Sequence, residues 1–255
     1  MISDGLSVTN NENMLALRGW LIALVLVALA VVISYFWLDR PIALFVHSQL
    51  PRNSRVLLEP VTYVPNPLIS LASLTFLVLG IRGLAGRPRS KMQTTILMCS
   101  VSLLIAETIK AQLKFVFGRT WPETWIQNNP SFIHDGVYGF NLFHGGEAYH
   151  SFPSGHMTAI CALTSVLWIY YPRLRPIYLM AILAVLVSLV GTNFHFLSDT
   201  IAGTFFGASI GLMVTILFSR PSNNIGLFLH DAGRIRRKVP PPERSAVATN
   251  KTSGQ

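Results

Sequence analysis

Six long apolar runs are the feature that most constrains how this chain can fold. A helix needs about 20 mostly apolar residues to cross the hydrocarbon core of a bilayer. None of the runs alternates between polar and apolar residues, as a half-buried strand does. The sequence therefore predicts an all-α integral membrane bundle with six transmembrane helices, over Gly19–Leu38, Val61–Ile81, Met92 to about Phe117, Ser151–Tyr171, Pro176–Phe194 and Thr200–Ser219.

The composition agrees with a membrane protein. Charged residues make up 12% of the 255 residues, against roughly 25% in an ordinary soluble domain. Hydrophobic residues make up 51%, which excludes disorder for most of the chain because disorder needs low hydrophobicity. The two cysteines, Cys99 and Cys161, lie inside apolar runs and are interpreted as packing residues rather than as a disulfide framework.

The Lys and Arg residues predict the orientation of the bundle. Six spans place both termini on one side of the membrane, and cytoplasmic loops are usually the richer in Lys and Arg. With both termini inside, the inner segments carry 14 of the 20 Lys and Arg residues and the outer segments carry 5. The loop from Arg82 to Lys91 is the best single marker, because it has four cations and no acid. We expect a bacterial inner membrane protein with cytoplasmic termini and outer loops that face the periplasm or exterior.

The chain is expected to have three parts. Residues 1–18 form a cytoplasmic N-terminal segment, residues 19–219 the six-span domain, and residues 220–255 a basic, partly disordered cytoplasmic tail. Within the tail, Ile225–Lys238 fits either a short basic amphipathic helix on anionic lipid at the inner surface or a solvated segment. The net charge of +9 is attributed to topology and anionic lipid, and no nucleic acid partner is expected.

Polar and ionisable residues gather where three of the predicted helices begin or end. In chain order they are Lys114, Arg119, Ser154, His156, His195 and Asp199. The third and fifth runs lead outward and the fourth leads back, so the topology brings all these residues to the outer surface. Ionisable residues near membrane depth are costly and usually functional. The sequence therefore predicts one polar site at this level.

These residue types suit the transfer of a phosphoryl group. The start of the fourth helix offers N–H groups and a positive dipole end to an anion, and Gly155 lets a ligand approach the backbone closely. His195 and Asp199 are four residues apart, so they share a helix face if the helix continues that far, and the carboxylate can then orient the imidazole. His156 supplies a second imidazole. We expect one histidine to attack phosphorus and the other to protonate the leaving oxygen, with no metal and no cofactor.

The same residues resemble the motifs of the type 2 phosphatidic acid phosphatase family, whose members are membrane lipid phosphatases related to the vanadium haloperoxidases. The family pattern begins with Lys, six residues and Arg-Pro. It continues with Pro-Ser-Gly-His, and it ends with Ser-Arg, five residues, His, three residues and Asp. The matching positions are Lys114, Pro122, Pro153–His156, Ser188, His195 and Asp199.

The resemblance implies a role for each matched side chain. His195 would be the nucleophile, Asp199 its orienting partner, and His156 the acid that protonates the leaving group. The groups that would hold the phosphate oxygens are Lys114, Ser154 and the Gly155 amide.

Two positions depart from the family pattern. Trp121 and Leu189 stand where the family has arginines that help to bind phosphate. Arg119 precedes Trp121 by two residues, so we expect Arg119 to bind phosphate in place of a lost arginine. The alternative for Arg119 is a side chain that reaches to lipid headgroups at the membrane edge. Trp121 is expected to fill the vacated position, either by packing or by contact with the headgroup.

These features predict a phosphatase that acts on a membrane lipid phosphate or diphosphate at the outer face, through a phospho-histidine intermediate. The resemblance implies substrates such as phosphatidic acid, phosphatidylglycerol phosphate, undecaprenyl diphosphate or lipid A. A lipid phosphotransferase would use the same intermediate, and a non-catalytic lipid-binding relative would explain the changes at Trp121 and Leu189. A transporter is disfavoured, because transporters usually place polar groups at the midplane and show internal repeats.

Two further features admit two interpretations each. Glu107 and Lys110, three residues apart in the third run, indicate a structural ion pair or, less favoured, a proton relay. The outer segment Gly118–His150 is rich in aromatic residues, which indicates a partial lid over the lipid headgroup or an interfacial anchor.

Overall fold

The computed structural model describes residues 2–50, 58, 60, 65–125 and 128–219. Within these ranges the chain forms helices and isolated bridges but no strand, which confirms the all-α class. Met1–Phe218 is one compact unit. The tail predictions, including the helix over 225–238, lie outside the described residues. The helices are α1 (Ile2–Ile33), η1 (Ser34–Leu38), α2 (Asp39–Gln49), α4 (Pro65–Leu84), α5 (Lys91–Phe117), α6 (Phe132–Asp135), η3 (Glu147–Tyr149), α7 (Gly155–Tyr170), η4 (Pro172–Leu174), α8 (Arg175–Gly191) and α9 (Leu197–Ser219).

The protein is an integral membrane protein, but the predicted count of six spans is not confirmed. In the described part of the chain, five helical segments are long and apolar enough to cross a membrane: Met14–Gln49, Pro67–Leu84, Lys91–Phe117, Pro172–Gly191 and Leu197–Ser219. The fourth predicted span, Ser151–Tyr171, forms only the 16-residue helix α7. It is shorter because Pro153 precedes the helix and Ser154, with extended backbone, caps it.

The first helical segment is longer than the apolar run that predicts it. The α1 helix begins at Ile2, within the predicted N-terminal segment. The π-helical turn η1 joins it to α2, which continues to Gln49. This continuation places Asp39, a charged residue just beyond the apolar run, in the first turn of a helix, where it is 1% exposed.

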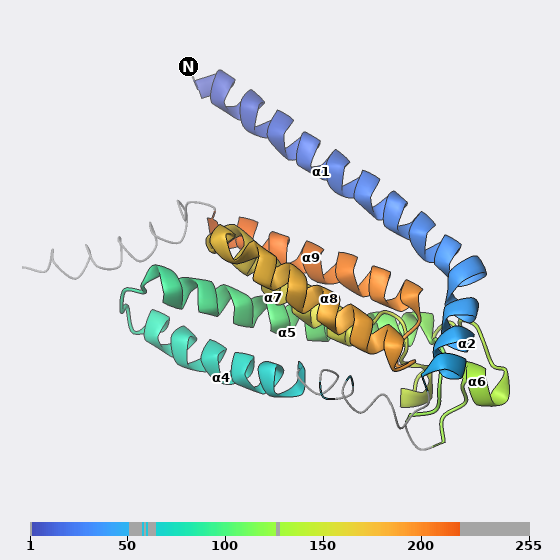
Figure 1. Ribbon diagram of the computed structural model, residues 1–255. Coiled ribbons are helices and arrows are strands. Elements are labelled where there is room, and N and C mark those ends of the chain that lie inside the picture. The colour runs from blue at the N-terminus through green and yellow to red at the C-terminus, as the bar shows by residue number, and fades with distance from the viewer. Residues whose placement is uncertain (1, 51–57, 59, 61–64, 126–127, 220–255) are drawn as a thin grey trace, which may run out of the picture. The chain divides into compact units, whose positions relative to one another are not determined.

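The helix α7 packs against α5, α8 and α9, and Figure 1 shows these helices side by side, with α4 beside α5. The buried residues Met98 and Cys99 of α5 meet Val166 of α7 and Val214 of α9. Both cysteines are buried and unpaired, as expected for packing residues.

Three glycines spaced by four bring α9 close to α7. A Cβ at Gly207 would overlap the carbonyl oxygen of Thr158 and lie 2.9 Å from the Cβ of Cys161. A Cβ at Gly203 would lie 2.6 Å from the carbonyl oxygen of the cap residue Ser154, and one at Gly211 would lie 2.6 Å from that of Ala162 in α7. Small residues spaced by four let membrane helices approach at backbone distance. This close approach seats the start of α9 against the start of α7, where the predicted site lies.

Replacing Gly207 with alanine is expected to destabilise the protein by about 1–3 kcal/mol, because the added methyl group overpacks a backbone contact. The measurement is thermal unfolding of the detergent-solubilised protein. Gly80→Ala in α4 is the matched control, since a Cβ at Gly80 meets nothing within 4 Å. Equal unfolding temperatures for the two variants would show that the α7–α9 contact tolerates a methyl group.

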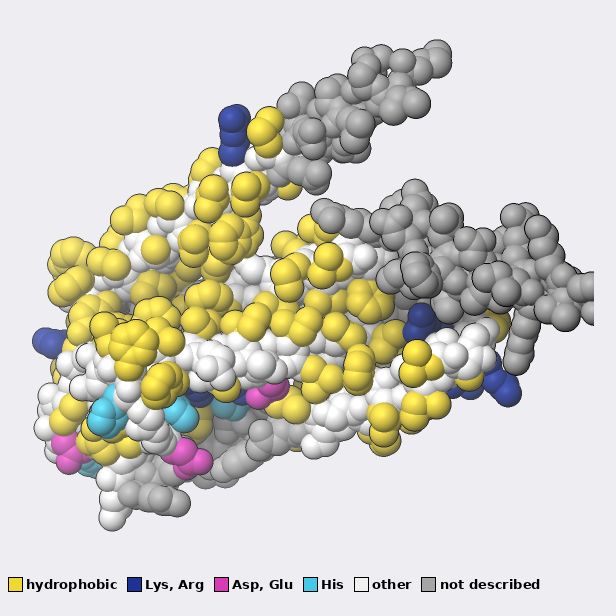
Figure 2. Space-filling model, turned by 180° about the vertical axis from the view of Figure 1, so that it is seen from behind, with side chains coloured by type: hydrophobic (Ala, Val, Ile, Leu, Met, Phe, Trp, Pro, Cys, Tyr) yellow, Lys and Arg dark blue, Asp and Glu magenta, His cyan; other side chains and the backbone are white. Residues whose placement is uncertain are grey.

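The parts of the chain that carry the predicted site meet at one end of the bundle. Figure 1 shows α2, α6 and the connection from α5 to α7 gathered at this end, where α8 also gives way to α9. The α5 helix ends at Phe117, and its cap Gly118, with left-handed backbone (φ +51°), turns the chain against Asn141. Figure 2 shows histidine and acidic side chains at this end, whereas hydrophobic side chains cover much of the helices beyond it.

Candidate active site

His195 and Asp199 are in contact, although they do not share a helix. The α8 helix ends at Gly191 and α9 begins at Leu197, so His195 lies in the connection and Asp199 in the first turn of α9. A shared helix face was expected only if the fifth helix continued to Asp199, and it ends before His195. The contact forms because the chain folds back: His195 Nδ1 lies 3.4 Å from Asp199 Oδ2, which also accepts a hydrogen bond of 3.0 Å from the Phe196 amide.

Ser151 completes this cluster. Its Oγ donates a 2.6 Å hydrogen bond to Asp199 Oδ2 and lies 3.5 Å from His195 Nδ1. Ser151 is fully buried and comes from the segment just before α7. Sequence reasoning missed it, because a serine three residues before a helix cap carries no distinctive signal. The cluster fixes the Nδ1 side of the His195 ring.

The opposite nitrogen of His195 is buried and differs in its surroundings. Nε2 has no hydrogen-bond partner among the residues that the structure describes. The His156 ring lies 5.9 Å from the His195 ring between centroids, at an angle of 65°, and Phe194 packs against both rings. Burial lowers the pKa of His195 below its ordinary value, and the nearby Asp199 carboxylate offsets this only in part. A neutral imidazole with an unpaired Nε2 has the form of a nucleophile.

The N-terminus of α7 lies beside the two histidines. The Ser154 hydroxyl accepts a hydrogen bond of 3.4 Å from the Met157 amide and so caps the helix. The Ser154 amide donates to the Asp199 carbonyl at 3.0 Å, which ties the start of α7 to α9. The amides of Gly155 and His156 follow, and the first N–H groups of a helix lack acceptors within it. The backbone here can receive an anion.

Trp121 packs against His195, and Lys114 lies near the same indole ring. The Trp121 ring is 5.2 Å from the His195 ring and 5.0 Å from the Phe194 ring, and Lys114 Nζ lies 5.7 Å from the indole centroid. Trp121 is 3% exposed, and its Nε1 donates a 2.9 Å hydrogen bond to the Glu147 carbonyl. Of the two interpretations offered for Trp121, the packing role is the one that the structure shows.

Arg119, which the sequence predicts to bind phosphate, contacts protein groups in the structure, and its phosphate contact stays a prediction. Arg119 has no exposed surface, and its guanidinium is held between two carboxylates. One terminal nitrogen donates to Asp199 Oδ1 and, at 2.6 Å, to the Ser198 hydroxyl. The other donates to Asp39 Oδ2 at 2.7 Å and to the Tyr138 hydroxyl at 3.2 Å. Both terminal nitrogens of Arg119 are therefore engaged by other protein groups.

Asp39 is a second residue that sequence reasoning missed. Its carboxylate accepts hydrogen bonds from the Ser198 amide at 3.0 Å and from the Ser198 hydroxyl, besides that from Arg119. A carboxylate directly after an apolar run was the available signal, although it equally fits a residue that faces water. In the structure, Asp39, Arg119, Asp199 and His195 form one buried chain of charged and polar contacts.

Leu189, the other changed position, lies in the hydrophobic core. It is fully buried in a cluster with Met157 and Cys161. The neighbouring Ser188 donates a 2.7 Å hydrogen bond to the Leu58 carbonyl. Leu189 therefore supplies packing beneath the site rather than a contact within it.

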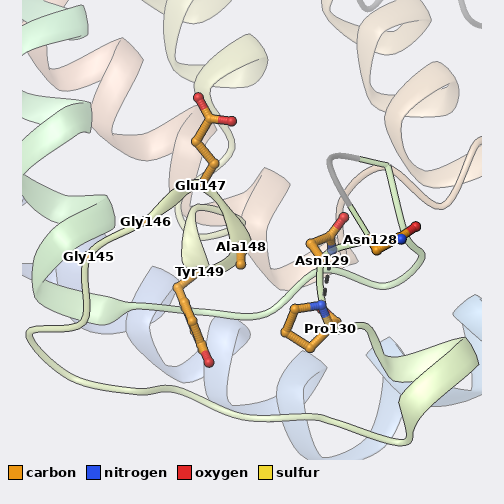
Figure 3. A pocket seen from close by; sticks show the side chains of 8 residues that line it. All are labelled: Asn128, Asn129, Pro130, Gly145, Gly146, Glu147, Ala148 and Tyr149. Atoms are coloured by element: carbon orange, nitrogen blue, oxygen red, sulfur yellow. Dashed lines mark hydrogen bonds between the residues drawn. The ribbon is translucent and has the colours of Figure 1, made fainter.

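A pocket of about 420 Å³ opens in the outer segment. One of its lining residues is Glu147, whose carbonyl accepts the hydrogen bond from Trp121. Figure 3 shows two stretches of this segment around the pocket, 128–130 and 145–149, with the Glu147 and Tyr149 side chains pointing in opposite directions. The described residues contain no group of three His, Cys, Asp or Glu side chains that could hold a metal ion.

Comparisons with known proteins place the chain in a family. The PAP2 superfamily matches residues 95–222, half of the chain, and this range includes all the predicted site residues. A lipid A 1-phosphatase of Rhizobium johnstonii is 36% identical over 92 residues, which cover 36% of this chain and 38% of that protein. A lipid A 1-phosphatase of Rhizobium etli is 34% identical over 92 residues, which cover 36% of this chain and 40% of that protein.

The matched region thus spans about two fifths of these curated relatives. Among solved structures, the chain is similar to a transmembrane PAP2 type phosphatidylglycerolphosphate phosphatase from Bacillus subtilis. The identity is 16%, the TM-score is 0.47, and the match covers 80% of this chain and 96% of the other. Since the family match extends over half of the sequence, the chain belongs to the PAP2 superfamily.

Proposed function

We propose that this protein is a lipid phosphatase that removes phosphate from a membrane lipid through a phospho-histidine intermediate on His195. The observation that carries the proposal is the asymmetry of the His195 ring. Asp199 and Ser151 contact its Nδ1 side, whereas the buried Nε2 has no hydrogen-bond partner among the described residues. A histidine oriented by a carboxylate through one nitrogen can attack through the other.

The reaction proceeds in two displacements. In the first, His195 Nε2 forms a bond to phosphorus, the bond from phosphorus to the lipid oxygen breaks, and His156 gives that oxygen its proton. In the second, His156 takes a proton from water, the water oxygen bonds to phosphorus, and the phosphorus–nitrogen bond breaks to release inorganic phosphate. The two imidazole rings lie 5.9 Å apart between centroids, which supports a role for both in one displacement.

The phosphate is proposed to lie at the N-terminus of α7. Ser154 and the Gly155 amide would supply hydrogen bonds there, and Lys114 would supply positive charge. Two relatives act on lipid A, as their names state, so lipid A that carries its 1-phosphate is the first substrate to test. Other lipid monophosphates and a lipid diphosphate complete the panel.

The test is phosphate release by the purified protein in mixed micelles with each lipid. The wild-type protein is expected to release inorganic phosphate from at least one of them, and His195→Ala is expected to release none. His134→Ala, a change in the outer segment, is the control and should match the wild type. Transfer of phosphate to a second lipid without release would indicate a phosphotransferase, and lipid binding without chemistry would indicate a non-catalytic relative.

The site is proposed to face the periplasm or exterior of a bacterial inner membrane, with cytoplasmic termini. Four cations between Arg82 and Lys91 support this orientation, because positive loops stay inside. Anionic lipid at the inner surface is the proposed partner of the basic tail.

Single cysteines test this orientation. Leu142→Cys, at an exposed position of the outer segment, is expected to react with a membrane-impermeant thiol reagent in intact cells. Ala85→Cys, exposed at the end of α4, is expected to react only after the membrane is opened. The native Cys99 and Cys161 are buried and serve as the unlabelled background. Labelling of Ala85→Cys in intact cells would reverse the orientation.

A further inference from the structure

Lys110 reaches the start of α7 from the neighbouring helix. A Cβ placed on Gly155 would lie 2.6 Å from Lys110 Cδ and 3.1 Å from its Nζ. The ammonium group therefore lies against the backbone of the first residue of α7, where the helix presents its N–H groups. Because Gly155 has no side chain, the Lys110 side chain can lie against its backbone.

The position of Lys110 on α5 aligns it with the site. Lys110 and Lys114 are one helical turn apart, so they lie on the same face of α5. Lys110 Nζ forms an ion pair of 2.5 Å with Glu107 Oε2. An ion pair between these two residues was the favoured interpretation of the sequence. Both side chains remain partly exposed, at 19% and 25%. An ammonium group has three donors, so the pair with Glu107 leaves donors for a further acceptor.

The candidate site needs a cation in addition to Lys114, and neither Arg119 nor Trp121 provides it. A transferring phosphoryl group carries negative charge on three oxygens, which positioned cations stabilise. The guanidinium of Arg119 is occupied by Asp39 and Asp199, and Trp121 is a buried apolar ring. Lys110 and Lys114 are the lysines that the end of α5 directs toward the α7 N-terminus and the Trp121–His195 stack.

We propose that Lys110 is a phosphate-binding residue of this site, which contacts a phosphate oxygen beside the Gly155 amide while Glu107 holds its ammonium group in place. This inference rests on the proposed function, since it assigns the ligand of the same site. The ion pair between Lys110 and Glu107 would then be part of the substrate site.

Binding of inorganic phosphate tests the proposal without turnover. Phosphate should raise the unfolding temperature of the wild-type protein, because a ligand that binds the folded state stabilises it. Lys110→Met keeps the length of the side chain without its charge and is expected to weaken phosphate binding about 10- to 100-fold, the effect of one charge-assisted hydrogen bond. Lys91→Met, at the opposite end of the same helix, is the matched control and should bind phosphate like the wild type.

Glu107→Gln separates phosphate binding from a structural ion pair. If Lys110 binds phosphate, Glu107→Gln weakens phosphate binding much less than Lys110→Met does, because the ammonium charge is retained and only its positioning partner is changed. If the pair is only structural, both variants lower the unfolding temperature alike and neither changes the phosphate affinity. That second pattern, or a wild-type protein that does not bind phosphate, overturns the proposal. A wild-type protein that binds phosphate through Lys110 but releases none from lipids would instead refute the proposed function alone.

Discussion

Replacing His195 with glutamine should reduce phosphate release by on the order of 10³-fold or more, because the variant lacks the nitrogen that forms the bond to phosphorus. His156→Ala should cost about 10² to 10⁴-fold, the usual contribution of a general acid and base. The measurement is the initial rate of phosphate release in mixed micelles. His134→Ala is the control, and the unfolding temperatures show that the variants are folded.

The pH dependence gives a second readout of the same prediction. His195 attacks only in its neutral form, and burial lowers its pKa below the ordinary value of 6.5. As pH falls, the midpoint of His195 protonation therefore lies below 6.5, and the acid limb of kcat/KM should have its midpoint below that pH. An acid limb with its midpoint well above this pH, or a His195→Gln variant with wild-type rates, would contradict the assignment of His195.

Replacing Asp39 with alanine should destabilise the protein by about 3–5 kcal/mol, because it removes one partner from a buried ion pair and leaves the Arg119 charge incompletely compensated. Turnover should fall as well, since Arg119 holds Asp199, and Asp199 orients His195. Thermal unfolding in detergent and phosphate release are the two measurements. Asp135→Ala, at the C-terminal end of the short helix α6, is the control for loss of an aspartate.

The companion variant Arg119→Lys distinguishes a positioning residue from a phosphate ligand. A lysine offers a point charge and cannot reproduce the fork that reaches both Asp39 and Asp199. We expect a lower unfolding temperature and lower turnover, with phosphate affinity kept in the protein that remains folded. A variant with the wild-type unfolding temperature but weakened phosphate binding would restore Arg119 as a phosphate ligand.

The helices of the bundle could be predicted closely from hydropathy, because the apolar runs are long and their ends carry local signals. The α5 helix begins one residue before its prediction, where Ser90 and Gln93 form a capping box. The position of α7 could be predicted but its length could not, since the residues just before Gly155 belong to the candidate site and not to the helix. Hydropathy could not predict α2, because Asp39 and Arg40 look like the end of a span while tertiary contacts keep the chain helical.

The residues of the site could be named from their order and spacing, whereas their contacts could not. The contacts of Arg119 could not be predicted, because a long side chain just beyond a helix end can reach in several directions and its partner Asp39 is 80 residues away in sequence. His195 and Asp199 meet through a turn and not through a helix face, and sequence spacing cannot distinguish the two. Lys110 was read as one half of an ion pair, because its approach to Gly155 depends on how α5 packs against α7.

The most direct test of the central claim is to trap the phosphorylated enzyme. The purified protein is mixed with its lipid substrate radiolabelled in the phosphate, quenched in alkali within the first turnover and digested. The account predicts label that is stable to alkali, labile to acid and located on the peptide that carries His195, with no label in His195→Gln. Phosphate release at the wild-type rate without such a phospho-histidine, or with label on another residue, would contradict it.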